Sequence, residues 1–163
     1  MVSQFTLDPM HLIYLGLVRK ILNSIVKGEI VGYKLTGENI ELFNSKLLKY
    51  ITNIPVDFVR KPRPIEDLGM WKATELRQFV LYTGIVVLKD IINHEIYSHF
   101  LLLHSAYRLI SQTNAKSIVT VANQVLAAFV KIFPIEAASF KYMKLSYNNK
   151  YVLIPLLHES GIL

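Results

Sequence analysis

Apolar residues recur every three or four positions through most of this chain, and strict alternation never lasts more than a few residues. The first spacing is typical of an amphipathic helix, whereas alternation is typical of a half-buried strand. Only seven glycines are present, and no internal repeat or low-complexity tract is visible. The sequence therefore predicts an all-α, mainly helical fold, built as an irregular antiparallel bundle of about five to seven helices.

The expected helices can be placed from their start and stop signals. Asp8 and Pro9 are suited to the N-cap and first position of a first helix that Gly28 ends. Thr36 is expected to cap a second helix that continues to Pro55. A third helical segment spans 72–92, as one helix or as two if Gly84 breaks it, because glycine costs a helix interior roughly 1 kcal/mol.

Two further helices follow. Asn93 is expected to cap a helix with Glu95, His99 and Arg108 toward solvent, and a last helix is expected over 116–133. The predicted inward faces of these two helices are Ile96, Phe100, Leu103, Tyr107 and Ile110 in one, and Ile118, Val121, Val125, Phe129 and Ile132 in the other. Residues 152–157 are an apolar run that Pro155 makes a poor helix interior, so either a short helix or an extended stretch is expected.

The length and hydropathy of the chain indicate that the predicted helices form a single folded domain. The 163 residues correspond to a single domain, 1–163, with a proline-rich basic connector at 55–71. The chain is 52% hydrophobic with a mean hydropathy of +0.35, which excludes a disordered tail. No window approaches the roughly 18–20 apolar residues of a membrane span, so no membrane partner is expected. The high hydropathy suggests instead that part of the apolar surface meets another protein.

Charge and cysteine content limit the partners and the kinds of site that this chain can have. Lys and Arg number 18 against 12 Asp and Glu, a net charge of +6 that permits nucleic acid or an acidic partner. The absence of cysteine excludes disulfides, thiolate zinc sites and a cysteine nucleophile. The N-terminal residues carry no basic n-region of a signal peptide, so we expect an intracellular protein, nuclear or cytoplasmic, that is not secreted.

The histidines do not have metal-ligand spacing. His94, His99 and His104 are separated by five residues, a step that turns a helix by about 140° and away from a shared face. We predict no metal site. Asp8 and His11 are three residues apart at a helix start, where Asp8 either accepts the backbone N–H of His11 as a cap or joins it in a metal or nucleic-acid site.

A basic cluster lies in the proline-stiffened connector. Arg60, Lys61 and Arg63 could hold phosphates, and the single tryptophan, Trp71, could stack on a base. The structural alternative is that these cations form salt bridges to Glu66, Asp67 or Glu75 while Trp71 anchors the connector in the core. The candidate nucleic-acid contacts are Arg60, Lys61, Arg63, Trp71, Lys72 and Arg77.

Three blocks, DPMHL at 8–12, FVRKPR at 58–63 and WKATELRQF at 71–79, together resemble transposon-encoded, transposase-like proteins related to CACTA-type and more distantly hAT-type elements. Active members of that family use a ribonuclease-H-like DDE domain. The resemblance implies that Asp8 and His11 correspond to an Asp-x-x-His signature. It departs at Met70, where an arginine usually precedes the tryptophan, and at Ile85, where relatives usually have proline.

The resemblance implies a helical middle piece of a transposase, because the family extends upstream through a cysteine-containing segment and downstream to a region that supplies a further acidic residue. The leading hypothesis is a non-catalytic domain, without cofactor, that binds DNA or another transposase-like chain or protein. A second hypothesis is that Asp8, with His11 and Glu75 as further candidates, contributes to a Mg²⁺-dependent DDE site completed by another polypeptide. A third is a plain helical protein-interaction module.

Overall fold

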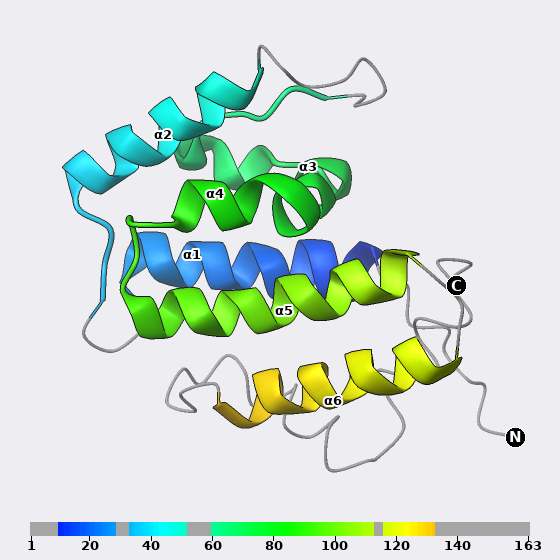
Figure 1. Ribbon diagram of the computed structural model, residues 1–163. Helices are drawn as coiled ribbons and strands as arrows, with labels where there is room; N and C mark the ends of the chain where they lie inside the picture. Colours follow the sequence, from blue (N-terminus) through cyan, green and yellow to red (C-terminus); the bar gives the residue numbers. More distant parts are fainter. Residues whose placement is uncertain (1–9, 29–32, 52–59, 113–115, 133–163) are drawn as a thin grey trace, which may run out of the picture.

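The computed structural model describes residues 10–28, 33–51, 60–112 and 116–132 (Figure 1). Helices account for 83% of these described residues, and no strand occurs among them. The expected all-α fold is therefore confirmed. Asp8, Pro9, Pro55 and the apolar run at 152–157 lie outside the described residues.

The described helical elements include regular α-helices as well as π- and 3-10 helical elements. In chain order they are η1, a π-helix (Met10–Val18), α1 (Arg19–Lys27), α2 (Gly37–Ile51), η2, a 3-10 helix (Ile65–Met70), α3 (Ala73–Gln78), η3, a π-helix (Phe79–Thr83), α4 (Gly84–Leu88), α5 (His94–Gln112) and α6 (Lys116–Ile132). η1 continues directly into α1, and α3, η3 and α4 form one unbroken helical run.

Helix α5 connects the two sides of the bundle. It packs against α6 on one side and against η3 and α4 on the other, and α2 covers α4. Figure 1 shows α5 running opposite in direction to α1 and to α6, with α6 at the edge of the bundle and α2 at the far end. Short connections produce this antiparallel order, since consecutive helices must turn back on one another.

Three predicted helix ends are confirmed. Gly28 follows α1 with φ of 77°, a left-handed conformation that glycine adopts without steric cost. The Thr36 hydroxyl accepts the backbone N–H of Asn39 at 3.2 Å before α2. The Asn93 side chain accepts the N–H of Ile96 at 2.8 Å before α5. Local capping chemistry therefore sets the boundaries of these helices.

The third predicted helix differs from the expectation in its end and in its interior. It ends at Leu88 rather than Ile92, and Asp90 follows with φ of 65°. Gly84 does not break it: the glycine is helical, with φ of −59°, and the irregularity is the π-helical turn just before it. A Cβ at Gly84 would lie 2.7 Å from the Phe100 ring, so this glycine permits close packing of α5.

The centre of the core is an aromatic cluster built from three helical elements and the connector. The Phe79 ring lies 5.8 Å from Phe43 of α2, 5.8 Å from Trp71 and 6.0 Å from Phe100 of α5, measured between ring centroids. All four rings are buried. Aromatic contacts at such separations add to the free energy of burial, so this cluster joins the connector to the helices around it.

Two expected orientations are wrong. His99 is buried rather than exposed on α5, because α6 packs over it. Val121 is 47% exposed, and the buried face of α6 is Ala122, Leu126 and Phe129. The apolar face of α6 is wider than the surface that α5 covers. The buried residues therefore lie on one side of the predicted inward face, and Val121 lies on the other.

Candidate functional site

The site begins with Glu75 at the third position of α3, which is where a carboxylate can cap a helix N-terminus. Its Oε2 accepts the backbone N–H of Lys72 at 2.7 Å. This bond satisfies a donor that would otherwise lack a partner in the first turn. The helix start thus fixes the position of the Glu75 carboxylate.

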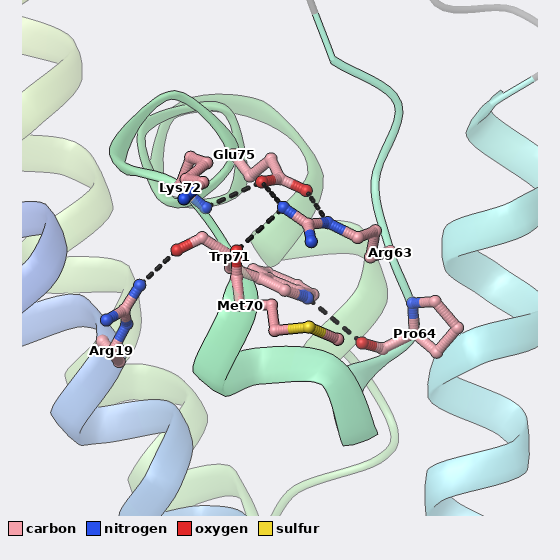
Figure 2. A network of polar contacts seen from close by, with 7 residues as sticks. All are labelled: Arg19, Arg63, Pro64, Met70, Trp71, Lys72 and Glu75. Atoms are coloured by element: carbon pink, nitrogen blue, oxygen red, sulfur yellow. Dashed lines mark hydrogen bonds and ion pairs between the residues drawn. The ribbon is translucent and has the colours of Figure 1, made fainter.

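Arg63 binds this carboxylate from the connector (Figure 2). Its Nε donates to Oε1 at 2.9 Å and one terminal nitrogen donates to Oε2 at 2.8 Å. The same nitrogen donates to the Met70 carbonyl at 2.8 Å. The Glu75 side chain is 2% exposed and that of Arg63 is 31% exposed. A bidentate pair of this kind fixes orientation as well as charge, so Arg63 closes the connector onto α3.

The ion pair changes the acidity of Glu75. Burial alone would raise the pKa of this carboxyl, but the hydrogen bonds from Arg63 and from the Lys72 backbone, together with the charges of Arg63 and Arg60, lower it below its usual value. Glu75 is therefore a carboxylate near neutral pH. Its oxygens are already engaged by a cation, which makes it a structural anion and a poor general acid.

Trp71 holds the other side of the connector. Its ring is 1% exposed, and its indole N–H donates to the Pro64 carbonyl at 3.1 Å. Of the two roles predicted for Trp71, the geometry shows the structural one: the ring anchors the connector in the core. In this conformation neither face of the ring is open to a base. The Trp71 carbonyl in turn accepts a hydrogen bond from the Arg19 guanidinium of α1 (Figure 2).

Two residues of this network were not found from the sequence. Arg19 reaches Trp71 across 52 positions. Asn44 of α2 accepts the Ile65 N–H at 2.9 Å and donates to both carboxylate oxygens of Glu66. Of the three acids proposed as salt-bridge partners, Glu75 is thus the one bound to Arg63, and Glu66 binds an amide. No local pattern marks these contacts, because they depend on which helices become neighbours.

The remaining basic candidates surround the ion pair. Arg60, Lys61, Lys72 and Arg77 are all exposed. Arg60 is close enough to Glu75 to lower its pKa, and Arg77 is hydrogen-bonded to the Tyr14 hydroxyl of η1. Residues 60–77 carry five cations and three carboxylates, a net charge of +2. With Glu75 buried, the cations dominate the exposed charge of this segment.

The catalytic candidates do not come together in the described residues. Asp8 lies outside them, and so does the side chain of His11, whose backbone is in η1. Within the described ranges, no group of three or more His, Cys, Asp or Glu side chains is arranged to hold a metal ion. The hypothesis that Asp8 completes a site with another polypeptide stays a prediction.

The side chains of two histidines of α5 donate hydrogen bonds to backbone carbonyls of neighbouring helical elements. The Nε2 of His99 lies 2.7 Å from the Phe129 carbonyl of α6, and its ring stacks on Phe129 at 4.1 Å between centroids. The Nδ1 of His104 lies 2.8 Å from the Val80 carbonyl in η3. A carbonyl only accepts, so each of these nitrogens carries a proton. Burial lowers the pKa of His99, although the bond to Phe129 opposes that shift.

Comparison of the chain with protein-family models, with curated proteins and with solved structures finds no match. The resemblance to transposases therefore rests on the three motif blocks alone. Within the described part of the chain, no helix is both long and apolar enough to cross a bilayer.

Proposed function

We propose that this chain is a non-catalytic, transposase-derived helical module that binds duplex DNA through exposed cations around the Arg63–Glu75 ion pair. The observation that carries the proposal is the division of charge in residues 60–77. The one candidate acid that the structure describes, Glu75, is buried and bound by Arg63, whereas Arg60, Lys61, Lys72 and Arg77 are exposed. Such an arrangement is suited to phosphate contact rather than to proton transfer.

The rigidity of this segment supports the same proposal. Trp71, Arg63 and Asn44 hold the connector at three points through hydrogen bonds to backbone atoms. A backbone that is held in this way loses little further conformational freedom on binding, which favours affinity. The net charge of +6 adds a general attraction to nucleic acid. A DNA-binding module of this origin acts in the nucleus.

The test is the salt dependence of binding to duplex DNA. We expect binding by the wild-type chain at about 50 mM salt, with an affinity that falls steeply as salt is raised. Replacing Arg60 and Lys61 together by alanine should reduce the slope of log affinity against log salt by about two, since each phosphate contact contributes about 0.9.

The matched control removes the same charge elsewhere. Lys34 and Lys131 are exposed and lie on the α1–α2 connection and on α6. The Lys34→Ala/Lys131→Ala variant should keep the wild-type slope. Failure of the wild-type chain to bind at low salt, or equal slopes for the two double variants, would overturn the proposal.

A further inference from the structure

We propose that residues 152–157 of this same chain dock on an apolar flank of α6. This flank consists of Ile118, Val121, Val125 and Ala128, whose spacing of three, four and three residues is that of one helix face. Val121 is 47% exposed, and the other three are half-buried. The flank lies beside the buried face formed by Ala122, Leu126 and Phe129.

The core covers this flank only in part: Val125 packs against the core, whereas Val121 is 47% exposed. In the described residues α6 packs against α5, and Figure 1 shows α6 at the edge of the bundle with α5 on one side. Among the other exposed apolar residues, Leu48 and Met70 are single, whereas Tyr82 and Val86 are four positions apart and the Arg108 guanidinium of α5 lies over the Tyr82 ring. A periodic apolar face is a typical docking surface, whereas single exposed residues are normal.

The chain itself contains an apolar segment of suitable size. Residues 152–157 are six consecutive apolar residues, and such a run is unfavourable if it is left in water. The run begins 20 residues after Ile132, the last residue of α6. A stretch of that length can span about 60 Å, whereas α6 is only about 25 Å long, so every point of the flank is within reach.

Tethering favours this occupant over a second copy of the chain. A segment covalently joined to its docking site by a short stretch of chain has an effective concentration there in the millimolar range. A second copy at micromolar concentration would need an affinity about a thousandfold higher to compete. The flank is therefore assigned to the chain's own C-terminal run.

The absence of native cysteine makes disulfide trapping a clean test. In the full chain, Val121→Cys is combined with Leu153→Cys or with Leu156→Cys. The control is Thr120→Cys with the same two partners, because the Thr120 side chain is exposed and lies about 100° around α6 from Val121, off the flank. We expect at least one Val121 pair to form an intramolecular disulfide about tenfold faster than its Thr120 control at low micromolar protein. Equal rates would overturn the proposal, and disulfide-linked dimers would assign the flank to a second copy.

A second measurement does not depend on the register of docking. Lys150 directly precedes the apolar run, so docking should slow tryptic cleavage at this residue. Val121→Asp should speed that cleavage severalfold, and Thr120→Asp, which places the same charge off the flank, should leave it unchanged. Both side chains are exposed, and far-UV circular dichroism should confirm that both variants keep their helices. Identical cleavage rates in wild type and Val121→Asp would contradict docking.

Discussion

The carboxylate of Glu75 connects the start of α3 with the connector. It caps α3 through Lys72 and binds Arg63 through both oxygens. A buried carboxylate with these partners stabilises the fold as long as the partners remain, whereas removing either one leaves a charge without compensation.

Glu75→Gln should therefore lower the free energy of unfolding by about 2 kcal/mol at neutral pH, because it removes the charge but keeps an oxygen for the Lys72 N–H. The pKa of Glu75 is lowered in the folded state, so its contribution is present above the ordinary value of 4.5 and is lost as pH falls through the lower folded value. The difference between wild type and variant in urea unfolding should shrink near pH 3. A Glu41→Gln control on exposed α2 should change little.

His99 provides an independent pH effect at the α5–α6 contact. Its pKa is lowered below 6.5 by burial, so the unfolded chain binds this proton more readily than the folded chain. The contribution of the neutral His99 ring to the free energy of unfolding is fully present above about pH 6.5. It decreases as the pH falls from there toward the lower pKa that His99 has in the folded chain. Wild type should lose more stability than His99→Gln between about pH 7.5 and pH 5.5, measured by urea unfolding. The exposed His94→Gln should behave as wild type, and an equal loss in all three chains would exclude this role.

Among the elements, the run from α3 through η3 to α4 contains a π-helical turn, and α5 packs against this turn. His104 donates to the Val80 carbonyl, and the Tyr97 hydroxyl donates to the Ile85 carbonyl at 2.8 Å. These two residues are seven positions apart, so they lie on one face of α5. Side-chain donors thus satisfy carbonyls in and beside the π-helical turn, which is a common reason that such turns persist.

Gly84→Ala tests the packing of these elements. The change in the free energy of unfolding that we expect has the opposite sign to the change that helix propensity alone predicts. In an exposed helix the change stabilises by about 1 kcal/mol. Here the new Cβ would lie 2.7 Å from both the Phe100 ring and the Phe79 carbonyl, so we expect a loss of about 2 kcal/mol in thermal or urea unfolding. Gly37→Ala has open space around its Cβ and should be neutral or stabilising. Stabilisation by Gly84→Ala would show that the contact relaxes at little cost.

Sequence periodicity and capping residues were enough to place most elements, because those signals are local. Gly28, Thr36 and Asn93 mark helix ends through their own backbone or side-chain chemistry. The burial of His99 and the exposure of Val121 were missed because both depend on where α6 crosses α5. For the site, the Arg63–Glu75 pair was one of three sequence alternatives, and nothing local selected it over Glu66 or Asp67.

Across the whole molecule, the buried and exposed charges lie in different places, and this division leads to the proposed function. The hydrogen-bonded connector and the aromatic cluster around Phe79 form a rigid end of the bundle, from which Arg60, Lys61, Lys72 and Arg77 are exposed. At the edge of the bundle, the flank of α6 is apolar and is assigned to the chain's own C-terminal run. The two proposals therefore assign DNA binding and docking to separate surfaces.

The most direct test is a titration of the isotope-labelled full chain with duplex DNA, followed by amide chemical shifts in NMR. Phosphate contact at the exposed cations should shift the amides of residues 60–63 and 72–77, while the amides of α6 and the Trp71 indole, which is bonded to Pro64, change little. An absence of shifts at low salt, or shifts concentrated on α6 instead of the cations around Glu75, would contradict the proposed role.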